Sequence, residues 1–570
     1  MDFDVVIKNG HIIDGVGNPW FKADIGVKDG RIAKISRISL KPSGRVVNAD
    51  GLIVCPGFIN LHSHSDGSIY AHNNAENCLS MGLVTELTGQ CGSSVAPITE
   101  EYKEMVKTTF RRRLSSWEEV DWLTFDEWVK RLEEKGVGIN VAYLAGHGTI
   151  RTCVMGDESE GGDRVVPTED EMDEMKAMLE GAMKEGAFGL STGLNYAPGR
   201  NAHADEIVEL AKVVAKYGGV YSSHMRCEGD KLLEATRELV NICEIARLRG
   251  TISHHKASGW TNFGKVVETL RMVEAARSRG VDVIIDQYPW RIGGTIKSLG
   301  TRFTASHSNK ESYASLRKEL VEKLKDDEEW KKIKANAVEN TRKEEELHKV
   351  RNEQLEEIGG WTSAPYAMQE GGIILHSKSH PELEGRTLEE VANSFGLDDI
   401  LEGIRALLIE DEGYTSAGNE PYSECDIITI LKYPWTTVST DQYALDNSKV
   451  SHQNAADALC IQHPRGWGTY PKILGKYVRE EKVLTIEEAI RKMTSLPAQF
   501  LGLQDRGIIR ENFWADIVIF DPEQVENLAT YENPQRYPRG IPYVLVNGQM
   551  AINKGERTGA LAGKTLRHMV

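Results

Sequence analysis

The sequence lacks any apolar run of 18 residues and any excess of positive charge. A helix needs about 20 apolar residues to span a bilayer, so no membrane segment is expected. The first residues, Met1-Asp2-Phe3-Asp4, also lack the basic region and apolar stretch of a secretory signal, which favours a cytoplasmic protein. The net charge of −17 argues against binding to nucleic acid or to an anionic membrane surface.

Cysteine is also scarce, with 8 residues in a chain of 570 and none in a Cys-x-x-Cys pair. A secreted disulfide scaffold is therefore not indicated. The hydrophobic content of 40% and the charged content of 27% are those of a globular protein with an ample core. The length exceeds one ordinary domain, although a barrel with insertions could take most of it.

The two ends of the chain show the short alternating patterns typical of β-strands. Asp29-Gly30 between two such patterns predicts a hairpin. Because the C-terminal end repeats this style, we expect one composite β-sandwich domain formed by residues 1–55 and 505–570. The predicted strands are Asp4–Ile7, His11–Asp14, Ala23–Lys28, Arg31–Ser36, Ala515–Asp521 and Tyr543–Gly548.

Between these ends, a strand pattern followed by a helix pattern recurs eight times. This alternation predicts a (β/α)₈ TIM-like barrel over residues 56–504. The strands are expected to begin near Ile59, Leu83, Ile139, Ala187, Val220, Thr251, Asp282 and Thr436. Apolar residues at three- and four-residue steps predict helices over Glu171–Glu185, Ala204–Tyr217, Lys231–Arg249 and Lys265–Arg279.

The gap between the seventh and eighth strands is unusually long. Within it, the highly charged segment Lys310–Glu357 carries a thin apolar stripe of Leu316, Leu320 and Leu324. A solvated helical hairpin is one interpretation. Because an insertion after a barrel strand emerges at the catalytic face, a lid is the other. We therefore expect a lid-like helical insertion at residues 291–357.

Six side chains that can bind a metal or move a proton stand at the ends of the predicted strands. Positions i and i+2 of a strand face the same way, so His62 and His64 can bind one cation together. Strand ends that converge on one mouth and carry such groups are what a metal-dependent barrel enzyme requires. The six are His62, His64, Cys91, His224, His254 and Asp441.

Each of these residues also has an ordinary structural interpretation. A lone cysteine such as Cys91 commonly behaves as a small buried hydrophobe, and Asp441 at a strand end can cap a turn or helix. His255 competes with His254, and spacing does not choose between them. The joint occurrence of six such groups at five strand ends nevertheless favours metal catalysis, and it argues against a non-catalytic scaffold.

Several longer stretches make the sequence similar to a known family. The chain resembles the N-acyl-D-amino-acid deacylase (D-aminoacylase) family of the amidohydrolase superfamily from Asp4 almost to the C-terminus. The stretches that carry the resemblance are Pro56–His64, Gly189–Tyr196, Ser223–Arg226, Ser253–Lys256, Asp286–Pro289, His463–Arg465, Gly468–Pro471 and Met493–Ala498.

The resemblance implies a zinc site with one tightly bound ion and a second, weaker position. Cys91, His224 and His254 would hold the tight zinc, while His62 and His64 would share Cys91 in the weaker position. Relatives differ at His255, which favours His254 as the ligand. Many amidohydrolases bridge two metals with a lysine on the fourth strand. Ala187–Leu194 has no lysine, which fits Cys91 as the substitute and argues against hydantoinase-type sites.

The resemblance also implies a substrate and a reaction. Arg465 and Tyr288 would bind the carboxylate of a small N-acyl amino acid, and Tyr196 would line the same pocket. Asp441 would act as the general base and then as the acid in hydrolysis of the N-acyl bond. The preference for D over L substrates rests on the resemblance alone.

Two differences from the family's usual pattern put the specificity in question. The stretch Ile292-Gly293-Gly294-Thr295 lacks a serine that members commonly use, so Thr295 is a candidate replacement. The segment between Asp441 and Arg465 is also longer than usual. Hydrolysis of cyclic or other small amides on the same barrel is the alternative function. The oligomeric state is left open.

Overall fold

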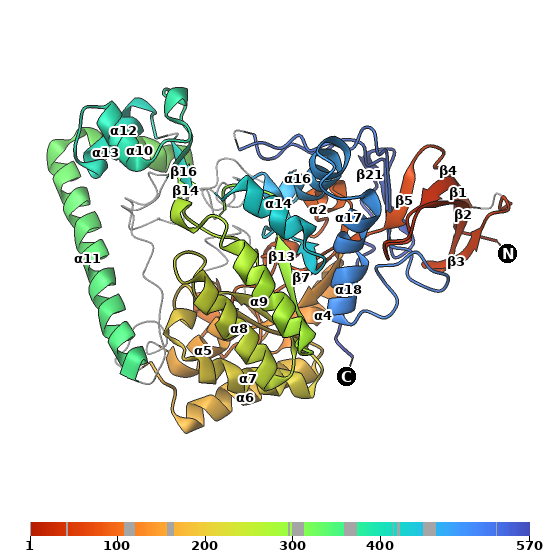
Figure 1. The fold of residues 1–570 in the computed structure, drawn as a ribbon, viewed down its shortest axis with the longest axis horizontal. Coiled ribbons are helices and arrows are strands. Elements are labelled where there is room, and N and C mark those ends of the chain that lie inside the picture. Colours follow the sequence, from red (N-terminus) through yellow and green to blue (C-terminus); the bar gives the residue numbers. More distant parts are fainter. Residues whose placement is uncertain are drawn as a thin grey trace.

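Two groups of strands organise the computed structural model (Figure 1). The structure describes residues 2–41, 44–107, 120–156, 165–293, 297–298, 313–357, 373–413, 415–418, 422–447, 463–531 and 533–569. One group is parallel and comes from the middle of the chain. The other joins both ends of the chain in one sheet.

The parallel strands form two sheets, with the orders β17-β13-β12-β11-β10-β9 and β6-β7-β8. Only Leu144 separates β8 from β9, and a parallel bridge between Ser63 and Gln442 follows β6 and β17. All eight predicted strands are present, each beginning within two residues of its expected start. The fold is thus mixed α/β with parallel sheets. The strands are β6 (Phe58–Asn60), β7 (Leu83–Thr88), β8 (Asn140–Tyr143), β9 (Ala145–Gly146), β10 (Gly189–Gly193), β11 (Val220–His224), β12 (Arg249–Ile252), β13 (Val283–Gln287) and β17 (Thr436–Val438).

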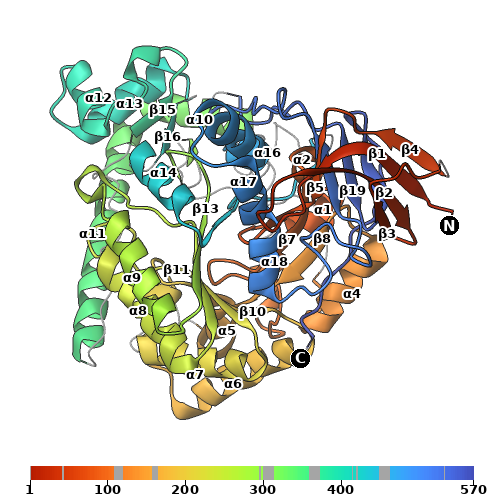
Figure 2. The same ribbon diagram turned by 45° about the vertical axis from the view of Figure 1, so that its right-hand side comes forward.

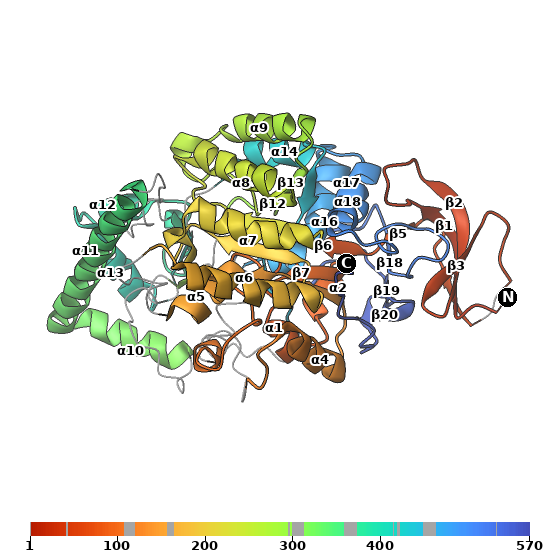
Figure 3. The same cartoon turned by 90° about the horizontal axis from the view of Figure 1, so that it is seen from below.

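Helices between these strands cover the outside of the parallel sheets (Figure 3). In α6, Thr168 and Glu171 form a capping box that fixes the first turn. The same helix buries Met175, Leu179 and Met183, which lie on one face at helical spacing. The four predicted helices are confirmed as α6 (Glu169–Lys184), α7 (Ala204–Lys216), α8 (Leu232–Ala246) and α9 (Val266–Ser278).

The ends of the chain share one nine-stranded sheet, in which β5 of the N-terminal part pairs with β18 of the C-terminal part. Figure 2 shows these red and blue strands side by side. The hairpin predicted at Asp29-Gly30 joins β2 and β3. One prediction was wrong. Asp4–Ile7 and His11–Asp14 were expected to be two strands, but both overlap the single strand β1, whose pairing with β2 shifts in register between Ile7 and Gly10. The strands are β1 (Val5–Ile12), β2 (Phe21–Lys28), β3 (Arg31–Ser36), β4 (Arg45–Asn48), β5 (Ile53–Pro56), β18 (Ile517–Phe520), β19 (Tyr543–Val546), β20 (Gln549–Asn553) and β21 (Glu556–Arg557).

The segment after β13 forms a separate helical unit at the edge of the molecule (Figure 1). Two helices form here as expected, and Leu320 and Leu324 of the apolar stripe are 4% and 0% exposed, so this part of the stripe is buried. They pack with residues as far along the chain as Leu408 and Ala417. Residues 294–296 and 299–312 of the expected insertion lie outside the described part of the chain. The elements are β14 (Lys297–Ser298), α10 (Tyr313–Lys325), α11 (Asp327–Glu357), β15 (Ile373–His376), α12 (Leu388–Ser394), α13 (Ile400–Glu410) and β16 (Ser416–Gly418).

Within the described ranges, no helix combines the length and the apolar character that crossing a membrane requires.

Candidate active site

The six predicted metal and proton-transfer residues all lie at or just after the carboxyl ends of parallel strands. His62 and His64 follow β6, and Cys91 follows β7. His224 is the last residue of β11, and His254 follows β12 by two residues. Asp441 follows β17. Parallel strands end on the same side of their sheet, and the structure brings all six side chains together there.

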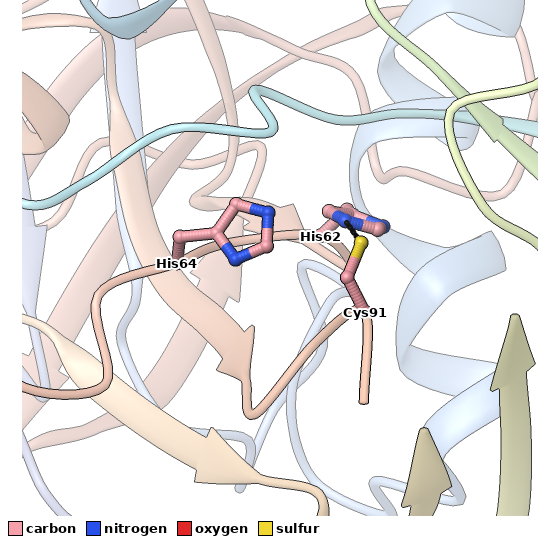
Figure 4. Close-up of side chains that lie close together, drawn as sticks. All are labelled: His62, His64 and Cys91. Carbon is pink, nitrogen blue, oxygen red and sulfur yellow. Dashed lines mark hydrogen bonds between the residues drawn. The ribbon is translucent and has the colours of Figure 1, made fainter. Parts of the chain in front are cut away.

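Cys91 is shared by two groups of possible metal ligands. His62, His64 and Cys91 form one group, and Cys91, His224 and His254 form the other, with the ligand atoms of each group within 4.8 Å of one another. The Cys91 Sγ lies 3.3 Å from His62 Nε2, 3.8 Å from His224 Nδ1 and 3.6 Å from His254 Nε2. Figure 4 shows the thiol next to the imidazole of His62, with the His64 ring close by.

The surroundings of Cys91 favour the thiolate. Burial alone would raise the pKa of the thiol, but the charge of His62 and hydrogen bonds from His224 and His254 lower it well below its ordinary value. A thiolate is the form in which cysteine binds a metal. Nitrogen and sulfur ligands at such short separations suit a borderline-soft ion such as zinc.

Three of the six residues have a left-handed backbone. The φ angles of Cys91, His254 and Asp441 are 52°, 35° and 49°. Such values are uncommon outside glycine, and they cluster at functional sites. Asp441 is held in this geometry by a hydrogen bond from its N–H to the carbonyl of His62, at 3.0 Å.

His254, and not His255, faces Cys91. The His255 Nε2 lies 2.7 Å from Thr269 Oγ1 on α9, away from the thiol. Burial lowers the pKa of His255 to about 3, and the neighbouring Lys256 adds to the effect. His255 is therefore a neutral histidine bound to α9, and of the two neighbours only His254 is placed beside Cys91.

Two buried carboxylates that the sequence did not single out contact the histidines. Asp286 lies 3.3 Å from His62 Nδ1, and it accepts hydrogen bonds from the backbone N–H of His254 and from Ser439. Glu228 lies 3.0 Å from His254 Nδ1. Carboxylates in such positions orient metal-binding histidines and fix their tautomers. Asp286 stands in a stretch that carried the family resemblance, whereas no sequence pattern marked Glu228.

Asp441 forms a buried ion pair with Arg465. The Arg465 Nη1 lies 2.7 Å from Asp441 Oδ2, while His64 Nε2 lies 3.0 Å from Asp441 Oδ1. Burial alone would raise the pKa of the carboxyl, but Arg465 and the hydrogen bond from His64 hold it well below its usual range. Arg465 Nε has no hydrogen-bond partner among the described residues, so it has a donor to offer.

The predicted tyrosines lie on two parts of the site. Tyr288 lies under the Arg465 guanidinium, 4.8 Å from it, and its hydroxyl is 3.5 Å from that of Tyr422. Tyr196 is 43% exposed and contacts the ring of His224 and the carbonyl of Cys91. Lys256, which the sequence did not single out, lies 5.6 Å from the Tyr288 ring. Thr295 is outside the described residues.

Comparison with known proteins agrees with this arrangement. A model described as "Amidohydrolase family" matches residues 443–552. The chain is 31% identical over 560 residues to N-acyl-D-aspartate deacylase of Alcaligenes xylosoxydans xylosoxydans, covering 98% of this chain and 93% of that protein. It is 30% identical to D-aminoacylase of the same organism, covering 99% and 97%. The chain belongs to the D-aminoacylase family of amidohydrolases.

A solved structure shares the fold of this D-aminoacylase family member. N-acyl-D-glutamate deacylase from Bordetella bronchiseptica matches with a TM-score of 0.73 and 29% identity, covering 100% of both chains. That crystal contains zinc and a phosphonate inhibitor, a mimic of the reaction's tetrahedral intermediate. The expected family resemblance is thus confirmed over nearly the whole chain.

Proposed function

We propose that this D-aminoacylase family member is a zinc-dependent enzyme that hydrolyses the amide bond of N-acyl-D-amino acids. The products are a carboxylic acid and a free D-amino acid. The observation that carries the proposal is the pair of histidine–cysteine groups sharing Cys91, directly beside the Asp441–Arg465 ion pair. Relatives named as deacylases of N-acyl-D-aspartate and N-acyl-D-glutamate support the substrate class.

The residues present fit a zinc ion. Cys91, His224 and His254 would hold a tightly bound ion, because a thiolate and two imidazoles leave a fourth position open for water. His62 and His64 would hold a second, weaker ion together with Cys91. Both groups are buried or half-buried, and their ligand atoms are close enough to bind one ion each.

Bound zinc would supply a Lewis acid that polarises the amide carbonyl and makes water a better nucleophile. Asp441 takes the proton from the attacking water at its carboxylate. It then delivers that proton to the amide nitrogen as the C–N bond breaks, so that the amine leaves neutral. His64 and Arg465 hold the Asp441 carboxylate in position for both transfers.

Arg465 would bind the α-carboxylate of the substrate. The protein carries a net charge of −17, so an anionic substrate needs a fixed cation near the reacting bond. The Arg465 Nε–H, which has no partner in the described part of the chain, and the planar guanidinium suit the two oxygens of a carboxylate. Tyr288 would support the guanidinium from one face, and Tyr196 would line the pocket beside His224.

We also propose how the parallel sheets, the two ends of the chain and the inserted helices are organised into domains. The parallel sheets would close into an eight-stranded barrel over residues 56–504, because Leu144 links β8 to β9 and the Ser63–Gln442 bridge joins the remaining edges. Residues 1–55 and 505–570 would form the composite β-sandwich domain. The lid expected at residues 291–357 would extend to Gly418, since its core includes Ala417.

One assay tests the proposal. Release of free amine is measured over matched N-acetyl-D- and N-acetyl-L-amino acids, with zinc present, after chelation and after zinc is restored. We expect turnover of the D series only, lost on chelation and recovered with zinc. Hydrolysis of hydantoins without hydrolysis of N-acetyl-D-amino acids would instead support a cyclic amidase.

A further inference from the structure

Glu228 lies behind the metal-binding side chains, in the loop between β11 and α8. The residue is 5% exposed, and its backbone carbonyl accepts a hydrogen bond from Ser258. The loop that follows His224 is thereby tied to the loop that follows His254. A carboxylate in such a buried position must have partners, because a bare charge there is very costly.

Three nitrogens surround the Glu228 carboxylate. Oε1 lies 3.0 Å from His254 Nδ1 and 2.5 Å from Lys256 Nζ, and Oε2 lies 3.8 Å from His224 Nε2. The two histidines belong to one proposed zinc group. Lys256 Nζ also lies 5.6 Å from the ring of Tyr288, a proposed residue of the substrate pocket.

Metal binding through His254 Nε2 requires one tautomer of this histidine. Its Nε2 faces the Cys91 Sγ, so Nε2 must keep a lone pair to bind a metal and Nδ1 must carry the proton. Both Lys256 Nζ, at 2.7 Å, and Glu228 Oε1 stand at Nδ1. An ammonium cannot accept a proton, so only the carboxylate can receive the Nδ1–H.

His224 has the opposite orientation and lies farther from the same carboxylate. Its Nδ1 faces Cys91, while its Nε2 lies 3.4 Å from Asn195 Nδ2 and 3.8 Å from Glu228 Oε2. The longer of these distances is beyond a hydrogen bond. Glu228 therefore contacts His254 directly and stands near His224 only as a charge.

We propose that Glu228 is a positioning residue that holds His254 in its metal-binding tautomer and orientation, with Lys256 fixing the carboxylate beside it. This inference rests on the proposed zinc site. Through Lys256, the carboxylate also links a zinc ligand physically to Tyr288.

A simpler explanation is that Glu228 only neutralises the buried charge of Lys256. Both explanations predict that replacing Glu228 alone does harm. They differ when Lys256 is replaced as well, because the neutralisation role then disappears while His254 still lacks its charged acceptor.

Glu228→Gln is the first variant, since it keeps the volume and removes the charge. A neutral amide oxygen accepts the Nδ1–H of His254 less strongly than a carboxylate does, and Lys256 competes for it. We expect zinc affinity, measured by competition with a chelator, to fall about 10- to 100-fold. We also expect the visible absorption of the cobalt-substituted protein to change. Unchanged affinity and an unchanged spectrum would overturn the inference.

Glu206→Gln is the matched control. Glu206 is also 5% exposed, and it contacts a histidine, His147, at 2.7 Å and a cation, Arg151, at 3.0 Å. It therefore suffers the same loss of a buried carboxylate without touching the proposed ligands. We expect its zinc affinity and cobalt spectrum to match the wild type. A loss equal to that of Glu228→Gln would reduce the effect to general destabilisation.

The double variant Glu228→Gln/Lys256→Met decides between the two explanations. We expect it to bind zinc as weakly as Glu228→Gln, and we expect Lys256→Met alone to bind zinc within a few-fold of the wild type. Recovery of wild-type affinity in the double variant would show that Glu228 only neutralises Lys256. If the wild type itself neither binds zinc nor releases amine, the proposed function fails instead, and these comparisons do not arise.

Discussion

Three of the residues that would perform the chemistry have a strained backbone conformation. Cys91, His254 and Asp441 all have positive φ values, in which the Cβ meets the backbone oxygen. This conformation costs about 1–2 kcal/mol for a residue other than glycine. The surrounding hydrogen bonds impose it, such as that from Asp441 N to His62 O. These three conformations therefore lower the stability of the folded protein.

Relief of that strain is measurable at Asp441. We expect metal-free Asp441→Gly to be more stable than metal-free Asp441→Ala by about 1 kcal/mol, because glycine adopts φ = 49° without a Cβ clash. Chemical unfolding of the two variants gives the difference. At Asp446, which is buried without a positive φ, the same pair of substitutions should show the ordinary order, with alanine more stable. If the alanine variant were more stable than the glycine variant at both positions, backbone strain at Asp441 would be excluded.

A second carboxyl near the site, Glu86 on β7, gives a pH-dependent stability. The pKa of Glu86 is raised to about 7. Burial is the largest cause and the charge of Asp66 adds to it, while hydrogen bonds from Ser65 and Ser63 act in the opposite direction. The folded pKa thus exceeds the ordinary value of 4.5. Folding stability must therefore fall as the pH rises from about 4.5 to about 7, because the folded protein holds the proton more strongly.

Glu86→Gln removes this titration while keeping an uncharged group of the same shape. We expect the variant to gain stability relative to the wild type as the pH rises, by up to about 3 kcal/mol between pH 5 and pH 8. Denaturant unfolding at these two pH values measures the change. A difference that does not vary with pH would mean that Glu86 does not titrate in this window.

Arg465 tests the assignment of the substrate carboxylate. Loss of a desolvated arginine–carboxylate contact costs roughly 2–5 kcal/mol, so Arg465→Ala should lower kcat/KM at least about 30-fold for N-acyl amino acids. The matching neutral amides should lose much less. Arg465→Lys should recover only part, since an ammonium cannot reproduce the planar pair of N–H groups. Equal losses on charged and neutral substrates would show that Arg465 only holds Asp441 in place.

Among the individual residues of the site, the sequence predicts the side chains at the strand ends. It does not identify the carboxylate and the lysine that contact them. His62, Cys91 and Asp441 follow strands whose order is visible in the pattern of apolar residues. Glu228 and Lys256 lie in loops, and their positions beside the histidines depend on how two loops pack. Local periodicity carries no information about such packing.

Among the secondary-structure elements, the inserted helices differ most from expectation. Leu320 and Leu324 make a narrow apolar stripe, which alone is typical of a solvated helix. Their partners include Leu401, Ile404 and Leu407 on α13, more than 70 residues along the chain. The apolar spacing in each segment does not show which distant segment it packs against. The strands of the parallel sheets and the helices α6, α7, α8 and α9, by contrast, follow local patterns and are predicted closely.

The shared core of the insertion predicts different results for two deletions. Removing residues 313–357 alone takes Leu320, Leu324 and Trp330 from a core that α12 and α13 need, so we expect the remainder to be digested readily by protease. Removing residues 297–418 with a short linker takes the whole unit. We expect this second variant to keep the thermal transition of the parallel-sheet part and the proposed zinc while its KM rises. A stable protein after the smaller deletion would show that α12 and α13 fold without α10.

At the scale of the whole molecule, the composite sheet is continuous with the candidate site. β5 pairs with β18 and with β1, and only Gly57 separates it from β6, which leads to His62. A Cβ on Gly57 would lie 2.2 Å from a methyl group of Val84 on β7. The two ends of the chain therefore anchor the first strand of the site.

The C-terminal segment makes a second attachment, at the parallel strand β8. Gly563 N donates to Val137 O at 2.8 Å, Val141 N donates to the carbonyl of Lys564 at 2.9 Å, and Leu566 N donates to Val141 O at 2.8 Å. A Cβ on Gly563 would lie 2.0 Å from the carbonyl oxygen of Ile139, so the segment can approach this closely only because residue 563 is glycine.

Gly563→Ala is therefore expected to loosen this attachment and to destabilise the whole protein. The backbone must move apart, which costs about 1–3 kcal/mol, as overpacking does elsewhere. The thermal unfolding midpoint measures the loss, and zinc content should not change, because the segment contacts none of the proposed ligands among the described residues. Gly181→Ala on α6 is the control, since no atom lies within 4 Å of its added Cβ, and alanine there should be neutral or stabilising. An unchanged midpoint for Gly563→Ala would mean that the C-terminal segment contributes little to holding the two parts of the molecule together.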